Sequence, residues 1–374
     1  MPWQTPISLL GRDLPRSYLS RHFAWLYLLV IVTVSLYPFS GWSWPPIPIL
    51  AYLWFPAPYY QAQVDDVLNV LAYIPFGAAL WGPLRARLGG FLAVLAATVL
   101  GGALSFGMET LQVFLPSRVA SNLDILHNTV GTAIGGLFSW TLGSRYFMRQ
   151  ASLLRHHWFV DGGWADFGLA LLVIWFVTQL DPSIPLFGVV ARPQGLPQPF
   201  ESPIDDPSMF LRFLESADAM FNLLVVTLLV SLLLEQRRYL WQLIGLVIGL
   251  AILVKLTTAG MLLKPIVFFQ WLNWRTLLGI AVGLVSLPLL LSLTVVAQAT
   301  VCAVALAVSV LVDWLWPLQA SPNAALVLFK WRSVQLSNFN GMSHTMADLW
   351  PWLMLIFLVG FARTHARRAR STWF

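Results

Sequence analysis

Acidic and amide side chains recur in pairs in the first third of the sequence, within runs that are otherwise apolar. The pairs are Asp65 with Asn69, Glu109 with Gln112, and Asp124 with Asn128. Their spacings of three or four residues put both members of a pair on one face of a helix. Carboxylates and amides accept hydrogen bonds from hydroxyl and amine groups, so three such helices brought together would form a polar binding site.

Arg118 is the only Lys or Arg between positions 88 and 144. We expect it to pair with Glu109 or Asp124, and it could also hold a phosphate or carboxylate. Each ionisable group inside a bilayer costs at least about 2.5 kcal/mol, so such groups tend to be kept for a reason. Two interpretations stay open, namely a binding site with Asp66 as a further member, or a buried network that fixes helix packing.

The composition places these residues in a membrane protein. The chain has 374 residues, of which 58% are hydrophobic and 10% are charged, and its mean hydropathy is +0.73. Soluble domains carry about 25% charged residues. These values exclude a water-soluble enzyme, a disordered chain and a nucleic-acid binder, despite the net charge of +6. The single cysteine, Cys302, excludes an intrachain disulfide and a cysteine metal cage.

No cofactor or metal is predicted, because the histidines lack metal-ligand spacing and no phosphate-binding loop or nucleophile elbow is present. A membrane-spanning helix needs about 20 mostly apolar residues. Ten ranges approach this length, so we predict an all-α, polytopic helical bundle with about ten transmembrane helices. The ranges are 22–40, 66–82, 91–114, 122–143, 164–181, 217–235, 239–258, 274–293, 296–315 and 347–362.

The distribution of Lys and Arg predicts the orientation of the chain. One set of alternate loops carries fourteen of these residues and the other carries eight. Because cytoplasmic loops are the richer in positive charge, both termini are expected in the cytoplasm. Segment 41–64 then lies outside, and its many aromatic residues and lack of charge suit the headgroup layer. The proline-rich segment 182–208 is expected to form an outer loop.

Small residues accompany the polar ones and predict close helix packing. Gly131 and Gly135 are four residues apart, a spacing that lets another helix approach closely. Pro75 and Gly77 allow a kink or a partly unwound turn in the second predicted span.

Three stretches together resemble the VanZ-like family of membrane proteins. They are DDVLNVLAYIPFG at 65–77, SFGMETLQ at 105–112 followed by Arg118, and NLDILHNTVGTAIG at 122–135. The resemblance covers roughly residues 20–145. It implies a multi-pass protein of the bacterial inner membrane with a role in the cell envelope, in a family named after a protein linked to resistance to the glycopeptide teicoplanin. It supplies no catalytic activity.

The second half of the sequence partly repeats the residue spacings of the first half. Asp218 and Asn222 repeat an acid-to-amide spacing, and Gly279 and Gly283 repeat the glycine spacing. We therefore divide the chain into a VanZ-like transmembrane domain at 1–160 and a second transmembrane domain at 161–374. A degenerate internal duplication is one hypothesis for these repeated spacings, and coincidence between apolar helices is the other.

The functional prediction is a non-catalytic envelope protein whose outer-leaflet site binds a lipid-linked or cell-wall/glycopeptide-related ligand, for example a polyprenyl-linked precursor. Membrane lipids are its other expected partners. An intramembrane enzyme with Glu109 or Asp124 as general base is an alternative, and a transporter is another. The candidate ligand-binding residues are Asp66, Asn69, Glu109, Gln112, Arg118, Asp124 and Asn128.

Overall fold

The computed structural model describes residues 19–37, 39–55, 63–143, 153–187, 205–316, 326–330 and 334–371, and this part of the chain is built from helices. It divides into two compact units, Met1–Ala170 and Leu171–Phe374, and the boundary falls inside one helix. The all-helical fold predicted from the sequence is confirmed for the described residues. Each unit is described in turn.

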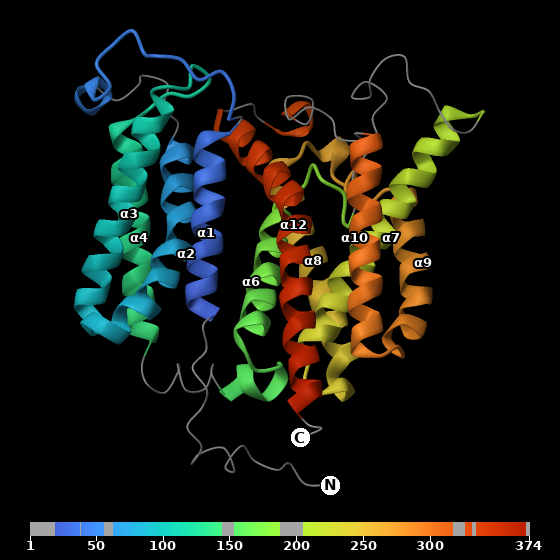
Figure 1. Ribbon diagram of the computed structural model, residues 1–374. Helices are drawn as coiled ribbons and strands as arrows, with labels where there is room; N and C mark the ends of the chain where they lie inside the picture. The colour runs from blue at the N-terminus through green and yellow to red at the C-terminus, as the bar shows by residue number, and fades with distance from the viewer. Residues whose placement is uncertain are drawn as a thin grey trace. The chain divides into compact units, whose positions relative to one another are not determined.

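Unit 1 is a bundle of four long helices with a short one at its edge (Figure 1). Its elements are α1 (Leu19–Leu36), η2 (Ala51–Trp54), α2 (Gln63–Leu88), α3 (Gly90–Gln112), α4 (Asn122–Leu142) and the first half of α6 (Gly163–Thr178). Helix α4 packs against α2 and α3, and α1 packs against the same two helices less extensively. Tyr27, Ile31, Tyr73 and Phe76 form an apolar cluster between α1 and α2.

Glycines bring α2 and α4 into backbone contact. A Cβ atom at Gly131 would overlap the carbonyl of Val70, and one at Gly135 would overlap the carbonyl of Ile74. On the opposite helix of this pair, a Cβ at Gly77 of α2 would overlap the carbonyl of Thr132 in α4. Helix α2 stays continuous through its prolines, so Gly77 serves close packing and does not mark an unwound turn.

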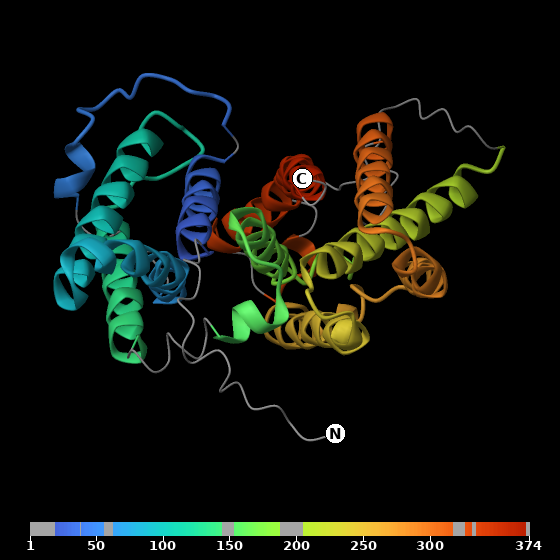
Figure 2. The same cartoon turned by 60° about the horizontal axis from the view of Figure 1, so that its bottom comes forward.

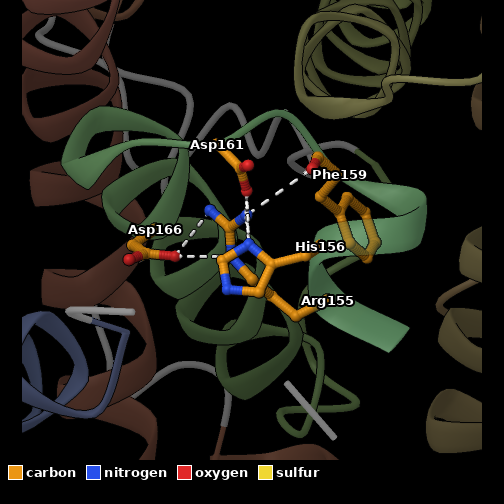
Figure 3. A network of polar contacts seen from close by, with 5 residues as sticks. All are labelled: Arg155, His156, Phe159, Asp161 and Asp166. Carbon is orange, nitrogen blue, oxygen red and sulfur yellow. Dashed lines mark hydrogen bonds and ion pairs between the residues drawn. The ribbon is translucent and has the colours of Figure 1, made fainter. Parts of the chain in front are cut away.

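A buried arginine holds the start of α6 within unit 1 (Figure 3). Nε and Nη2 of Arg155 both lie 2.8 Å from Asp166 Oδ1, and Nη1 lies 2.8 Å from Asp161 Oδ1. The ring nitrogen Nδ1 of His156 contacts the same Asp161 oxygen. The network ties the helical turn at 153–158 to the first turn of α6.

Unit 2 is arranged around α7, whose residues from Leu223 to Leu233 are all buried. Helices α9 and α10 pack on either side of α7 (Figure 2), while α8 packs on it only lightly. The elements are α7 (Pro207–Leu233), η4 (Arg237–Tyr239), α8 (Leu240–Leu262), η5 (Pro265–Val267), α9 (Trp274–Leu291), α10 (Val295–Leu315), η6 (Leu326–Leu328) and α12 (Val334–Ser371).

Each of the ten predicted spans falls on a helix. Within the described residues, eight helices are long and apolar enough to cross a membrane by length and composition. The other two are α4, which carries Asp124, His127 and Asn128 in its first two turns, and α6, which has 16 residues. Predicted features at 56–62 and 188–204, and the side chain of Asp65, lie outside the described residues.

Candidate ligand site in unit 1

The predicted polar residues gather at the end of unit 1 where α1 and α3 end and where α2 and α4 begin (top of unit 1 in Figure 1). We call this region the loop end of unit 1. The 112–122 connection and segment 39–55 both lie there, and the latter is tied to the helices by hydrogen bonds. The loop end therefore collects side chains from three helices and two connections.

Glu109 is the most buried acid of this group, with 4% of its surface exposed. Its Oε2 accepts a hydrogen bond of 2.8 Å from the backbone N–H of Ser121. Ser121 is also the N-cap of α4, where its hydroxyl accepts from the N–H of Leu123 at 3.2 Å. Glu109 thus joins the end of α3 to the start of α4, and its charged neighbours are Asp124 and Arg118.

Below Glu109, two buried polar atoms have no hydrogen-bond partner among the described residues. Asn128 donates from Nδ2 to Ser105 Oγ at 2.9 Å, but its Oδ1 accepts nothing. The Tyr73 hydroxyl lies next to Ser105 and near Glu109 and Asp124, and no hydrogen bond of regular geometry is formed to it within the described residues. Buried polar atoms are almost always bonded, so this pair marks a place that a ligand group or a water can complete.

His127 is a member of the group that the sequence interpretation missed. Its Nδ1 lies 3.3 Å from Oδ1 of Asp66, across the α2–α4 contact, and both side chains are partly exposed. The signal was present in the sequence, because His127 is four residues before Gly131 and therefore lies on the face of α4 that meets α2.

Arg118 and Gln112 contact the end of α1. Nε and Nη2 of Arg118 donate to the carbonyls of Tyr37 at 2.8 Å and Val34 at 2.7 Å. Gln112 Nε2 donates to the carbonyl of Ser35 at 3.0 Å. These carbonyls are the unpaired acceptors at the C-terminal end of α1, so the two side chains cap that helix.

The expected ion pair between Arg118 and Glu109 is not formed among the described contacts, because the guanidinium is directed to the end of α1. Burial lowers the pKa of the Arg118 guanidinium, and the nearby carboxylate of Glu109 opposes this effect. Arg118 therefore contributes to the site as a charge at a distance. Asn69 lies half-buried on α2 without a side-chain hydrogen bond to another described residue.

Segment 39–55 forms an apolar rim beside the polar group. The Tyr52 hydroxyl is 3.0 Å from Thr110 Oγ1, and Asn122 Nδ2 donates to the carbonyls of Leu53 and Phe55. Trp44 and Trp54 are more than four-fifths exposed. The exposed large apolar residues of the segment are Phe39, Trp42, Trp44, Ile47, Leu50, Trp54 and Phe55. Tryptophan-rich, uncharged surface of this kind suits the headgroup layer of a membrane.

The chemistry that this arrangement can offer follows from which groups are already used. Nε and Nη2 of Arg118 and Nε2 of Gln112 already donate to backbone carbonyls. Among the acceptors, Oδ1 of Asn128 has no hydrogen-bond partner in the described part of the chain, and it lies close to the buried carboxyl group of Glu109. Such a set favours ligand groups that donate hydrogen bonds, namely hydroxyl and amine groups.

The fold and the apolar helices define a multi-pass helical membrane protein. Residues 23–143 match the VanZ/LLP1 family, so the chain carries a domain of this family over α1 to α4, the helices that build the loop end. The family resemblance predicted from the sequence is confirmed over this range. No curated protein and no solved structure matches the chain.

Proposed function

We propose that unit 1 binds a lipid-linked or cell-wall precursor through hydroxyl or amine groups of its polar headgroup. The observation that carries the proposal is the buried carboxylate of Glu109 with the unbonded Asn128 oxygen and Tyr73 hydroxyl beside it. In this proposal the loop end faces the outer leaflet of a bacterial inner membrane, with both chain termini in the cytoplasm.

The rim on segment 39–55 supports an amphipathic ligand. Exposed indole rings next to a polar group at one helix end suit a molecule whose chain lies in the lipid and whose headgroup lies at its boundary. Nε and Nη2 of Arg118 and Nε2 of Gln112 already donate to backbone carbonyls, which disfavours phosphate as the main recognition element. The proposal therefore assigns recognition to the sugar-like or amine-bearing part of the headgroup.

Native mass spectrometry of lipids retained after gentle extraction tests this proposal. The variant is Glu109→Gln, which replaces the carboxyl group with an amide but keeps an oxygen that can accept from Ser121 N–H. Glu235→Gln, at an exposed acid of unit 2, is the matched control. A buried ligand donor that loses its matching acceptor costs about 1–3 kcal/mol, so retention should fall by about fivefold or more in Glu109→Gln alone.

A second experiment identifies which part of the lipid headgroup is recognised. Nanodisc-reconstituted protein is titrated with a polyprenyl-linked sugar and with the corresponding polyprenyl phosphate. We expect the sugar-bearing lipid to bind more tightly and to lose this advantage in Glu109→Gln. The proposal is contradicted if wild type and variant bind both lipids equally, or if both retain the same bulk phospholipids. The polar residues at the loop end would then be a network that only stabilises helix packing.

The His127–Asp66 pair favours one alternative, an enzyme acting on the same ligand. A histidine next to a carboxylate is the arrangement that general bases use, and this pair is more exposed than Glu109. The His127→Gln variant separates the two functions. Loss of product formation with ligand still bound would establish catalysis, whereas an unchanged lipid after prolonged incubation with wild type leaves binding alone.

A further inference from the structure

A short chain of polar side chains crosses three helices of unit 1 below Glu109. It runs from Asn128 on α4 through Ser105 on α3 to Tyr73 on α2. Ser105 lies four residues before Glu109, and Asn128 four residues after Asp124, so both are about one helical turn deeper in the bundle. All three residues are buried, with at most 6% of the surface of each exposed. They form a connected polar group inside otherwise apolar surroundings.

The donors along this chain point in one direction. Nδ2 of Asn128 donates to Ser105 Oγ at 2.9 Å, so the hydroxyl hydrogen of Ser105 is left for another acceptor, and the neighbouring oxygen of Tyr73 is one. The chain then ends in an acceptor, Asn128 Oδ1, and in a donor, the Tyr73 O–H. Neither end forms a hydrogen bond of regular geometry within the described part of the chain.

The two ends of the chain require opposite partners. The amide oxygen of Asn128 can only accept a hydrogen bond, whereas the Tyr73 hydroxyl, with Ser105 beside its oxygen, has a hydrogen to donate. Buried polar atoms that lack a partner are rare and destabilising, so both ends favour a group that completes them. A single group that does so must donate one hydrogen bond and accept another.

A hydroxyl group meets this requirement, and other common headgroup atoms do not. A hydroxyl both donates and accepts, so it can bond to Asn128 Oδ1 and to Tyr73 at once. A protonated amine only donates, which leaves the Tyr73 hydrogen without an acceptor. An ether or ionised phosphate oxygen only accepts, which leaves Asn128 Oδ1 without a donor. Sites built to hydrogen-bond a hydroxyl reject analogues that lack it, because buried polar groups then stay unpaired.

We propose that the Tyr73–Ser105–Asn128 chain determines the specificity of the unit 1 ligand site and selects a hydroxyl group of the ligand over an amine. The selection rests on the proposed function and narrows its ligand class to headgroups that present a hydroxyl, such as a sugar or another polyol. Tyr73 donates to the ligand oxygen, and Asn128 Oδ1 accepts from the ligand O–H. Ser105 is a positioning residue, since it holds the amide of Asn128 in place.

Three probe lipids with the same isoprenoid chain and different polar groups test this selection. They are farnesol, farnesylamine and farnesyl methyl ether, titrated into the full-length protein in detergent, with bound lipid counted by native mass spectrometry. We expect farnesol to bind about tenfold more tightly than either analogue, because each analogue leaves one buried group unpaired. The nearby carboxyl group of Glu109 would favour an ammonium ion, so a preference for the alcohol cannot arise from charge.

Variants assign the preference to the two ends of the chain. Tyr73→Phe removes the donor, so farnesol should lose its advantage over farnesylamine and keep it over the ether. Asn128→Leu removes the acceptor and should have the converse effect.

Tyr27→Phe is the matched control, because the Tyr27 hydroxyl belongs to the same apolar cluster as Tyr73 but donates to the carbonyl of Ala72 at 2.7 Å. This variant should lower the unfolding temperature and leave the lipid preferences unchanged. Tyr73→Phe should do the opposite, since it removes a hydroxyl that lacks a regular hydrogen bond. A merely structural role of Tyr73 would not change the ratio of the lipid affinities.

Three outcomes overturn the hydroxyl selection. They are farnesylamine binding to wild type at least as tightly as farnesol, no binding of any of the three probes, and lipid preferences that are unchanged in Tyr73→Phe. The last outcome would mean that a water completes the chain and that the ligand binds elsewhere. If Asn128→Leu does not fold, Tyr73→Phe decides alone.

The polyprenyl-linked sugar tests the proposed function separately. If wild type binds that lipid but does not prefer farnesol among the three probes, only the hydroxyl selection is wrong. If wild type does not bind it, the proposed function itself is wrong.

Discussion

The α2–α4 pair of unit 1 and the α7–α9 pair of unit 2 contain similar residues, but these residues have different roles. Both pairs have glycines spaced four apart on the later helix. In unit 1 both Gly131 and Gly135 abut backbone carbonyls of the partner helix. In unit 2 Gly279 abuts the carbonyl of Ser216, but Gly283 faces the side chain of Leu223. The α2–α4 contact is thus close over a longer stretch.

The acids of the two pairs differ more. In α7, Glu215 lies 2.8 Å from Arg275 of α9, and Asp218 accepts from Asn222 at 2.9 Å and from Ser309 at 3.0 Å. These acids join helices to one another. In unit 1, Glu109 is held by a backbone N–H, and its strongest cationic neighbour is directed elsewhere. An acid that is not consumed by an ion pair is the one available to a ligand.

The same difference bears on the duplication hypothesis. In unit 1, α3 packs against both α2 and α4, whereas α8, which follows α7 in the chain, packs on α7 only lightly. Helix α10 packs on α7 instead. The light contact of α8 with α7 therefore does not repeat the contact of α3 with α2.

Breaking the ion pair of unit 2 should have the largest effect. Arg275→Met removes the charged partner of the buried Glu215, and such a change costs about 3–5 kcal/mol. Glu109→Gln in unit 1 should cost less than about 1 kcal/mol, because glutamine still accepts from Ser121 N–H. Thermal unfolding followed by tryptophan fluorescence compares them. Similar losses of stability in the two variants would show that Glu109, like Glu215, mainly stabilises the fold and is not kept available for a ligand.

The glycines test how closely each pair packs. Gly135→Ala pushes a Cβ into the backbone carbonyl of Ile74, which cannot rotate away, so we expect a loss of about 3 kcal/mol. Gly283→Ala meets the Leu223 side chain, which can change rotamer, and should cost about 1 kcal/mol or less. The same unfolding assay applies. Equal losses at the two positions would show that α7 and α9 are packed as tightly as α2 and α4.

Helix capping gives a third contrast. Arg118→Met removes charge-assisted bonds to the end of α1 and should cost about 2 kcal/mol. In unit 2, Gln298 makes neutral bonds to the carbonyls of Leu291 and Leu293 at the end of α9, so Gln298→Leu should cost about 1 kcal/mol. If Arg118→Met abolishes lipid retention while the unfolding temperature is unchanged, Arg118 binds ligand and does not cap.

These contrasts also separate what the sequence predicts from what it does not. Helix positions and close packing at Gly131 and Gly135 follow from local spacing, which is why they could be predicted. The partner of Arg118 could not, because it depends on where a helix more than 80 residues earlier ends. The hydrogen bond between Asp181 and Asn340 in unit 2 joins residues that are 159 apart in the chain. Long-range contacts of this kind leave no periodic signal.

The N-caps of α4 and α7 give the smallest contrast, and it depends on pH. Asp206 caps α7 and accepts from the N–H groups of Ser208 and Met209. The Ser208 hydroxyl and these N–H groups lower the pKa of the Asp206 carboxyl. Its contribution is therefore complete above the unfolded-state pKa, near 3.9, and is lost as the pH falls toward the lower folded-state value. Ser121, the N-cap of α4, does not titrate.

We therefore expect Asp206→Ala to lower the unfolding temperature at pH 7 and to have a smaller effect at pH 3. Ser121→Ala removes an uncharged cap worth about 1 kcal/mol, and its effect should be the same at both pH values. Differences between each variant and wild type, measured by thermal unfolding at the two pH values, cancel the titration of the rest of the chain. A Ser121→Ala effect that is smaller at pH 3 would mean that this cap acts through Glu109, which accepts a hydrogen bond from the Ser121 N–H. The stability of the loop end would then depend on the acid that we propose binds the ligand.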